Sequence, residues 1–421
     1  MPPVRILVVD DSVVIRKLLT TTLGEIPGLE VVATAALGKI ALAKIQQCHP
    51  DVVILDVEMP EMDGIETLKR IRKDSPRLPV IMFSTRTERG AAATIEALTS
   101  GASDYVAKPS NAGNVLIAMA RVREEMVPKI FALASGARPA LGRPVTAPLP
   151  VTPSITTSIA IKQLVATTPA PRPGAPKRFD TTALLPILAA EPALRSSAIT
   201  ANPVLITDGP IRLRQTAGRR AQVEIVAIGA STGGPNALSV LLDQLPAEFP
   251  VPIVIVQHML ASFTRHFAQR LASQCKIKIV EATAGDVLVP GCAYVARGDY
   301  HLVVERRAGR ASLTINQDPL ENFCRPAVDV LFRSVAASYG SGTLAVVLTG
   351  MGHDGLAGCG AICQAGGDVI VQDEATSVVW GMPGFVARAG LASDVLALDQ
   401  VGREVRRRVG LRAAPALEAL P

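Results

Sequence analysis

The feature that most constrains this chain is an alternation of short, β-branched apolar runs with helical patterns, which occurs in two separate stretches. In the first stretch the runs predict five strands, over residues 5–9, 31–35, 52–56, 80–84 and 104–107. Helical patterns such as 13–23 and 64–73 lie between them. Strands that alternate with helices form parallel sheets. Residues 1–125 therefore predict a compact, five-stranded parallel α/β domain.

The second stretch repeats the alternation over residues 222–408. Its predicted strands are 225–228, 253–257, 278–281, 293–295, 301–304, 344–348 and 368–372. We expect a second α/β domain here, doubly wound and mainly parallel. In such open sheets, ligands bind outside the carboxyl ends of the strands. Candidate functional residues should therefore follow the strands directly.

Between these stretches, residues 126–221 predict a flexible linker. Fourteen of the 32 prolines lie between 128 and 210, among Ala, Thr and Ser, and such a composition favours an extended tether. Residues 126–221 hold 12 Lys or Arg against 3 acidic residues, a charge of +9, whereas the whole chain carries +6. The excess positive charge of the chain therefore lies in the linker. Two apolar pieces, 155–165 and 183–190, are either transiently helical or dock on a partner. Residues 409–421 predict a loose tail.

Composition narrows the class of protein. An aromatic share of 3% argues against a nucleic-acid platform built on base stacking. The six cysteines show no metal-ligand spacing, and the chain enters its first strand without a signal-peptide pattern. No apolar run of about 18 residues would span a membrane. We therefore expect a cytoplasmic protein.

Reactive side chains follow the strands of the first domain. Asp10, Asp11 and Asp56 follow two strands that should be neighbours, and Ser84 and Lys108 end two more. An aspartate that accepts a phosphoryl group needs a divalent cation and a fixed positive charge beside it. Carboxylates suit Mg²⁺. The alternative is that these acids are solvated loop residues, which is the common role of any one of them alone.

These motifs resemble the receiver domain of two-component systems, a flavodoxin-like fold. The resemblance rests on Val8-Val9-Asp10-Asp11-Ser12, Leu55-Asp56-Val57-Glu58-Met59-Pro60, Asp63-Gly64 and Lys108-Pro109. It implies phosphorylation of Asp56 by a histidine kinase. It also implies that Mg²⁺ is held by Asp11, Asp56 and the Glu58 carbonyl, with Asp10 acting through water. Ser84 and Tyr105 match the switch positions.

The second domain carries a serine in a turn between a strand and a helix. Gly229-Ala230-Ser231-Thr232-Gly233 fits G-x-S-x-G, a nucleophile elbow, but it also fits a phosphate-binding glycine loop. A dinucleotide site would need an acid at the end of the next strand. That strand ends instead in His258, which suits a general base.

A third residue should orient this histidine. Asp354 lies in a glycine-rich loop after a predicted strand and is the natural choice, with His353 as a possible distractor. Backbone N–H groups at Thr232 and Gly233, together with the Met351 loop, could stabilise an oxyanion. For Thr232 an ordinary helix N-cap is an equally good interpretation.

The second domain resembles the chemotaxis protein-glutamate methylesterase family. The resemblance rests on the elbow with Pro235, Gln257-His258-Met259, Arg325-Pro326-Ala327-Val328-Asp329, Gly350–Gly355 and Trp380-Gly381-Met382-Pro383. It implies a hydrolase that is activated by phosphorylation and needs no cofactor for the ester reaction. The implied substrates are glutamate γ-methyl esters and certain glutamines of methyl-accepting chemoreceptors. The enzyme would be associated only peripherally with membrane receptor arrays.

Two departures and three alternatives stand beside this resemblance. The linker is longer than in familiar members, and Gly384-Phe385 stands where they carry a basic residue. The second domain could instead be inactive, making the protein a phosphorylation-gated adaptor. The esterase could act on a receptor outside chemotaxis. A basic linker also suits a DNA-binding response regulator, although no helix-turn-helix signature is present.

Overall fold

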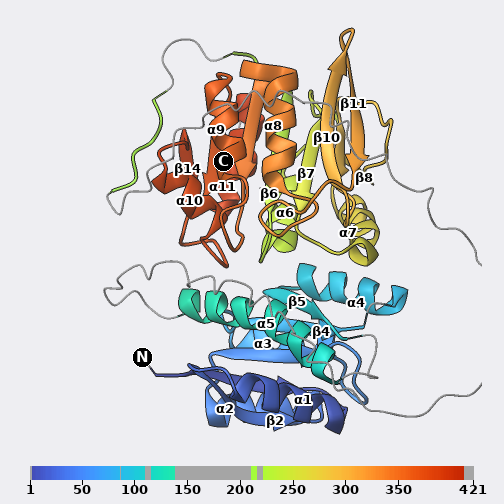
Figure 1. Cartoon of the computed structure of the whole chain (residues 1–421), viewed down its shortest axis with the longest axis vertical. Coiled ribbons are helices and arrows are strands. Elements are labelled where there is room, and N and C mark those ends of the chain that lie inside the picture. The colour runs from blue at the N-terminus through green and yellow to red at the C-terminus, as the bar shows by residue number, and fades with distance from the viewer. Residues whose placement is uncertain (1, 86, 110–114, 138–209, 216–220, 412–421) are drawn as a thin grey trace, which may run out of the picture. The chain divides into compact units, whose positions relative to one another are not determined.

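The computed structural model describes residues 2–85, 87–109, 115–137, 210–215 and 221–411 (Figure 1). Most of the predicted linker, with its apolar pieces 155–165 and 183–190, lies outside the described residues, as does the tail beyond 411. Two separate parallel sheets account for the main architecture, and both belong to one compact unit. Within the described ranges, no helix is both long and apolar enough to cross a membrane.

The first sheet has the strand order β2-β1-β3-β4-β5, with every neighbouring pair parallel. Its strands are β1 Val4–Val9, β2 Leu29–Ala35, β3 Val52–Asp56, β4 Val80–Ser84 and β5 Asp104–Ala107. Its helices are α1 Val13–Gly24, α2 Gly38–Cys48, α3 Gly64–Asp74, α4 Glu88–Thr99 and α5 Val115–Ala137. This is the order of a flavodoxin-like sheet, and the prediction for the first domain is confirmed.

Local chemistry explains where several of these helices begin. Ser12, Asp63 and Thr87 precede α1, α3 and α4, and each side chain accepts a hydrogen bond from a backbone N–H in the first turn. Such caps satisfy donors that have no partner within the helix. The last helix differs from expectation. α5 continues to Ala137 with Pro128 inside it, so the predicted domain boundary at residue 125 falls within a helix.

The second sheet has seven strands in the order β14-β13-β12-β6-β7-β9-β8, again parallel throughout. They are β6 Ile225–Ala230, β7 Ile253–Gln257, β8 Lys278–Glu281, β9 Cys292–Val295, β12 Thr343–Val347, β13 Asp368–Gln372 and β14 Asp394–Leu396. The helices are α6 Gly234–Asp243, α7 Ala261–Gln274, α8 Val328–Tyr339, α9 Leu356–Gln364, α10 Met382–Arg388 and α11 Leu398–Arg408. A 3₁₀ turn, η1 Gly340–Gly342, precedes β12.

The strand order of this sheet reverses between β6 and β12. The strands β7, β8 and β9 lie on one side of β6, and the later strands β12, β13 and β14 lie on the other side. Ligand sites of open α/β sheets lie at such a switch point. The predicted doubly wound, parallel architecture is confirmed, and the carboxyl ends of β6, β7 and β12 mark where its site should be.

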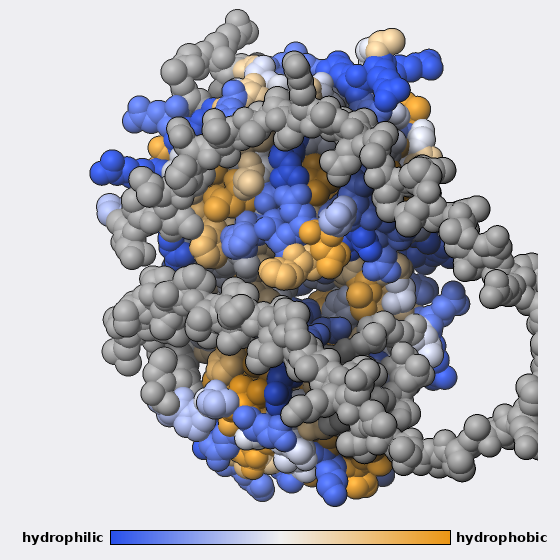
Figure 2. Space-filling model, in the orientation of Figure 1, coloured by the Kyte–Doolittle hydropathy of each residue, from blue (hydrophilic) through white to orange (hydrophobic). Residues whose placement is uncertain are grey.

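One predicted strand does not join the main sheet. β10 His301–Arg307 pairs antiparallel with β11 Arg310–Asn316 to form a separate hairpin. Neither β11 nor the three-residue β14 was predicted. The central strands β6, β7 and β12 are buried along their whole length. Hydrophilic and hydrophobic residues are interspersed among the coloured atoms on the face seen in Figure 2.

The C-terminal helix is fixed by a buried cation. The Arg408 side chain is 3% exposed and contacts Asp368 at 2.8 Å, Glu404 at 2.6 Å and Asp394. These carboxylates come from β13, α11 itself and β14. A buried guanidinium needs such pairing because an uncompensated charge is costly in the interior. α11 is thereby joined to the edge of the seven-stranded sheet.

Candidate active site and phospho-acceptor site

The first site lies at the carboxyl ends of two neighbouring strands. Asp10 follows β1 and Asp56 ends β3, and both side chains are buried, whereas Asp11 is exposed. Carboxylate oxygens from the three residues lie within 4.8 Å of one another. The sequence-predicted acidic cluster is therefore brought together.

Among the residues that the structure describes, one cation faces the two buried carboxylates. Lys108 Nζ lies 2.9 Å from Asp10 Oδ2 and 2.7 Å from Asp56 Oδ2. Burial raises the pKa of Asp56 to about 6, and the Asp10 charge adds to this, although the contact with Lys108 opposes it. One ammonium thus leaves the cluster with excess negative charge. Three clustered oxygen donors with excess charge fit a hard divalent cation such as Mg²⁺.

The predicted supporting residues surround this cluster in different ways. The Glu58 N–H donates to Asp56 Oδ1 at 3.2 Å, which directs the turn after β3 toward the carboxylate. Ser84 is buried, and its hydroxyl donates to the Gly90 carbonyl at 3.1 Å rather than to an acid. The Tyr105 hydroxyl accepts a hydrogen bond from the Leu260 N–H at 3.2 Å. Direct roles of Ser84 and Tyr105 at a phosphoryl group stay predictions.

The second site begins with the turn between β6 and α6. Ser231 follows the last residue of β6, and the helix starts three residues later. Gly233 has φ +78°, a left-handed conformation that favours glycine. A Cβ there would also lie 2.6 Å from the Val378 side chain. The turn therefore requires glycine, as the nucleophile-elbow interpretation predicts.

His258 and Asp354 are joined directly. His258 follows β7, Asp354 lies in the loop between β12 and α9, and His258 Nε2 is 2.7 Å from Asp354 Oδ2. Because a carboxylate only accepts, Nε2 carries the proton of a neutral imidazole and Nδ1 has the free lone pair. Burial opposes charge on the ring, but the bonds with Asp354 and Cys324 raise the pKa of His258 overall. The pairing favours the imidazolium that forms when this histidine acts as a base.

Asp354 is held by an unusually full set of donors. Its oxygens accept from the N–H groups of Val328, Asp329 and Gly355 at 2.6, 3.0 and 3.0 Å, and from Asn322 Nδ2 at 2.9 Å. Val328 and Asp329 open α8, where N–H groups have no partner within the helix. Burial alone would raise the pKa of Asp354, but the His258 bond and these donors lower it. The carboxylate is ionised and fixed.

Asn322 is a site residue that the sequence analysis did not identify. Its amide donates to Asp354 and also to Asp329 Oδ2 at 2.9 Å, so it bridges two buried carboxylates. Asn322 and Phe323 both have positive φ, and Glu321 and Cys324 exchange backbone hydrogen bonds around them. This pattern defines a tight turn of type I′. The sequence offered one signal, an asparagine, which tolerates positive φ and favours turns.

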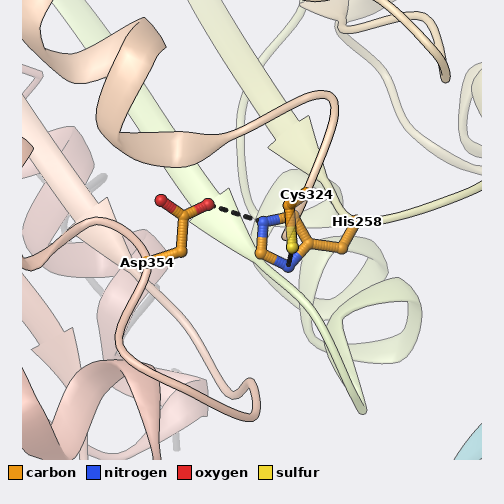
Figure 3. Close-up of side chains that lie close together, drawn as sticks. All are labelled: His258, Cys324 and Asp354. Carbon is orange, nitrogen blue, oxygen red and sulfur yellow. Dashed lines mark hydrogen bonds and ion pairs between the residues drawn. The ribbon is translucent and has the colours of Figure 1, made fainter. Parts of the chain in front are cut away.

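The other ring nitrogen of His258 faces a thiol. Figure 3 shows Asp354 at one nitrogen of the imidazole and Cys324 at the other, and the Cys324 Sγ to His258 Nδ1 distance is 3.7 Å. Among the described residues, none accepts a hydrogen bond from the Ser231 hydroxyl. Ser231 is located instead by its backbone, with its N–H donating to the Thr349 carbonyl at 3.1 Å. Cys324 was not predicted as a site residue.

The Met351 loop lies against the elbow. A Cβ placed on Gly350 would be 2.9 Å from Ser231 Cβ, so these backbones are in close contact. Within the described ranges, neither the Thr232 N–H nor the Met351 N–H donates a hydrogen bond, whereas the Gly233 N–H donates to the Ser103 carbonyl at 3.0 Å. The N–H groups of Thr232 and Met351 are therefore available to a substrate oxygen.

The Thr232 side chain does not cap its helix. Its hydroxyl donates to Asp104 Oδ2 at 2.5 Å, and α6 has no side-chain cap. Asp104 and Ser103 belong to the first domain, at the start of β5. The elbow thus has two hydrogen bonds to that strand, one from Thr232 and one from Gly233.

The remaining histidines near this site have other roles. His353 is exposed and lies edge-on to Phe385, with ring centroids 5.9 Å apart, so it does not compete with Asp354. His301 is buried and bonded at both nitrogens, to the Pro319 carbonyl and the Ala327 N–H. These bonds fix both ends of the loop that carries Asn322 and Cys324.

Comparison with known proteins shows which family each domain matches. Residues 226–405 match the family model described as CheB methylesterase, and residues 6–120 match that of the response regulator receiver domain. A protein-glutamate methylesterase/protein-glutamine glutaminase from Trichodesmium erythraeum is 46% identical, covering 97% of this chain and all of its own. Proteins of the same name from Nocardioides and Maricaulis maris are 45% and 41% identical, covering 99% and 96% of this chain and 98% and 95% of theirs.

Proposed function

Because this chain belongs to the protein-glutamate methylesterase/protein-glutamine glutaminase family, we propose that it removes methyl groups from glutamate γ-esters of chemoreceptors. Methanol is the product, and the same site releases ammonia from specific glutamines. The observation that carries the proposal is the fixed pair of His258 and Asp354 beside the elbow of Ser231.

The proposed reaction is acyl transfer through Ser231. His258 Nδ1 takes the hydroxyl proton as Ser231 Oγ attacks the ester carbonyl, and Asp354 stabilises the imidazolium. The N–H groups of Thr232 and Met351, which donate no hydrogen bond within the described residues, would stabilise the oxyanion. The C–O bond to methoxide then breaks, and His258 donates its proton to release methanol. Water hydrolyses the acyl-serine by the same steps and frees the glutamate carboxylate.

The first domain is proposed to control this reaction by phosphorylation of Asp56. A carboxylate oxygen attacks phosphorus on the phosphohistidine of a histidine kinase, the P–N bond breaks, and an aspartyl phosphate forms. Asp11, Asp56 and the Glu58 carbonyl would hold Mg²⁺, with Asp10 acting through water. Bound Mg²⁺ neutralises charge on the phosphoryl oxygens. Lys108 lies where it can pair with the product.

The hydrogen bonds of the elbow support control by occlusion. Ser103 and Asp104 accept from Gly233 and Thr232, and Tyr105 bonds to Leu260, two residues after His258. Ser103 directly precedes β5, Asp104 and Tyr105 begin it, and this strand leads to Lys108. In the proposed switch, new charge at Asp56 biases this strand and weakens its bonds to the elbow.

The test is methanol release from methylated receptor membranes by the wild type and by Ser231→Ala, with and without a small-molecule phosphodonor. Release that depends on serine and rises with phosphodonor is expected. No release by the wild type would favour a phosphorylation-gated adaptor or a receptor outside chemotaxis. Release that ignores the phosphodonor would retain the enzyme and reject the switch.

A further inference from the structure

We propose that Gln257 is a positioning residue of the hydrolase, whose side-chain amide holds the peptide between Ser231 and Thr232 and thereby fixes the Thr232 N–H as an oxyanion donor. Gln257 is the last residue of β7 and is 2% exposed. The catalytic part of this inference rests on the proposed function, whereas the part that concerns the peptide does not.

The register of the sheet brings this glutamine to the elbow. Gln257 pairs with Ala230, the residue before Ser231, across the neighbouring strands β7 and β6. Its Nε2 donates to the Ser231 carbonyl at 2.9 Å and to the His258 carbonyl at 3.2 Å. A side-chain amide nitrogen carries two hydrogens, so both are used. One buried group thus joins the backbones of the proposed nucleophile and the proposed general base.

The other end of the amide indicates that packing alone does not explain this residue. Gln257 Oε1 is buried, and no donor among the described residues reaches it. A buried acceptor without a partner is destabilising, and an apolar side chain of similar size would avoid that cost. Turning the amide over would place this oxygen against two carbonyl oxygens. The two donated bonds therefore account for a glutamine at this position.

Gly234 leaves room for the amide. A Cβ at this position would lie 2.1 Å from Gln257 Oε1. The Gly234 N–H also donates to the Ser231 carbonyl, at 2.7 Å. The Ser231 carbonyl therefore accepts two hydrogen bonds, one from the start of α6 and one from the end of β7.

Bonds to this carbonyl act on the N–H at the other side of the same peptide. A peptide unit is planar and trans, so the Ser231 C=O and the Thr232 N–H point in opposite directions. Fixing the carbonyl fixes the direction of the N–H, which donates no hydrogen bond within the described residues. The bonds also polarise the peptide and make its N–H a stronger donor, because linked hydrogen bonds reinforce one another.

The second proposed oxyanion donor is supported in the same way. The Met351 N–H belongs to the peptide that contains the Gly350 carbonyl. That carbonyl accepts from the N–H groups of Gly381 and Met382 at 3.1 and 2.9 Å. Each oxyanion peptide thus has a carbonyl bound by two donors. Three of these four donors are backbone N–H groups, and the fourth, the Gln257 amide, can be removed by substitution.

The structural part is tested by NMR on the full-length protein, labelled with ¹³C at serine carbonyls and ¹⁵N at threonines. The sequence contains two Ser-Thr pairs, at 84–85 and 231–232, so two correlations are expected, and Ser231→Ala identifies the second by its loss. Gln257→Met keeps the approximate size but loses both bonds, and should move the Ser231 carbonyl resonance upfield. Gly234→Ala, which displaces the amide, should move it in the same direction.

Gln244→Met is the matched control. Gln244 directly follows α6 in the same domain, and its Nε2 donates to the Val240 carbonyl at 3.0 Å. The substitution therefore removes an amide-to-carbonyl bond at the far end of the helix that follows the elbow. Both Ser-Thr correlations should keep their wild-type positions.

The catalytic part is tested by the kinetics of methanol release. Removal of an oxyanion donor itself lowers kcat by about 10²- to 10³-fold. Gln257→Met keeps the donor but loosens it, so kcat should fall by about tenfold. KM should change less than about twofold, because the oxyanion forms only in the transition state. Gln244→Met should have the wild-type kcat.

Two results would overturn the inference. The first is a Ser231 carbonyl resonance that does not move in Gln257→Met or in Gly234→Ala. The second is a Gln257→Met enzyme that has the wild-type kcat or a loss confined to KM. A wild type that releases no methanol but shows the expected shifts in its variants refutes the proposed function alone.

Discussion

Asn322 offers a sharp test of how Asp354, the proposed active-site carboxylate, is held. Replacing it with glycine removes the amide that donates to Asp354 and Asp329, while glycine accepts the positive φ of +52° without strain. Asn322→Gly therefore separates the hydrogen bonds from the turn. Asn322→Asp keeps the shape but places a third carboxylate beside two buried ones.

The expected loss follows from the donors that remain. A hydrogen bond to a charged group contributes about 1.5 to 3 kcal/mol, which would correspond to a roughly 10- to 150-fold effect on rate. Asp354 keeps three backbone donors from Val328, Asp329 and Gly355. We therefore expect kcat of Asn322→Gly to fall about tenfold, near the lower limit, with little change in KM. Asn322→Asp should lose far more, because like charges repel strongly in a buried site.

The assay is methanol release from methylated receptor membranes, with thermal unfolding followed in parallel. Phe323→Gly is the control, because Phe323 occupies the next position of the same turn, also has positive φ, and is 94% exposed. It reports the effect of a more flexible turn alone. A kcat for Asn322→Gly within twofold of the Phe323→Gly value would refute the reasoning.

Three further predictions concern other parts of the molecule. Since the pKa of Asp56 rises from 3.8 to about 6 on folding, its contribution to stability is fully present below pH 4 and lost as the pH rises through 6. In metal-free buffer, the free energy of unfolding of Asp56→Asn should therefore exceed that of the wild type by about 3 kcal/mol at pH 8 and equal it at pH 3.5. Denaturant titration measures both values. Equal stability of the two proteins at both pH values would contradict this. Gly350→Ala should reduce kcat by at least tenfold with intact circular dichroism, because the new Cβ would lie 2.9 Å from Ser231 Cβ, and an unchanged rate would show that the loop yields freely. Thr232→Val removes the bond to Asp104 and should raise methanol release without phosphodonor severalfold; a constant ratio of basal to stimulated rate would count against the gate.

Sequence patterns located the residues that follow strands but not those on irregular loops. Asp56, Ser231 and His258 each end or follow a buried β-branched run. A run of this kind is recognisable in the sequence, and its end places the residue at the carboxyl edge of the sheet. Asn322 and Cys324 lie on a loop without periodicity, and Cys324 meets a histidine 66 residues away in sequence. Only tertiary folding could bring that pair together.

The errors in element boundaries have physical causes as well. Pro128 suggests the end of a helix, yet it lies inside α5. β14 is only three residues long and forms because β13 provides a parallel neighbour. β11 has alternating burial, but charged and hydroxyl residues at its exposed positions obscured the pattern.

The Arg408 ion pairs also bear on truncation. Arg408 lies on α11 but pairs with Asp368 of β13 and Asp394 of β14, and β13 pairs with β12, whose following loop carries Asp354. Removing one partner of a buried ion pair is strongly destabilising. A chain cut before α11 would keep Ser231, His258 and Asp354 but lose the cation at the edge of the sheet, and we expect it to fold less stably.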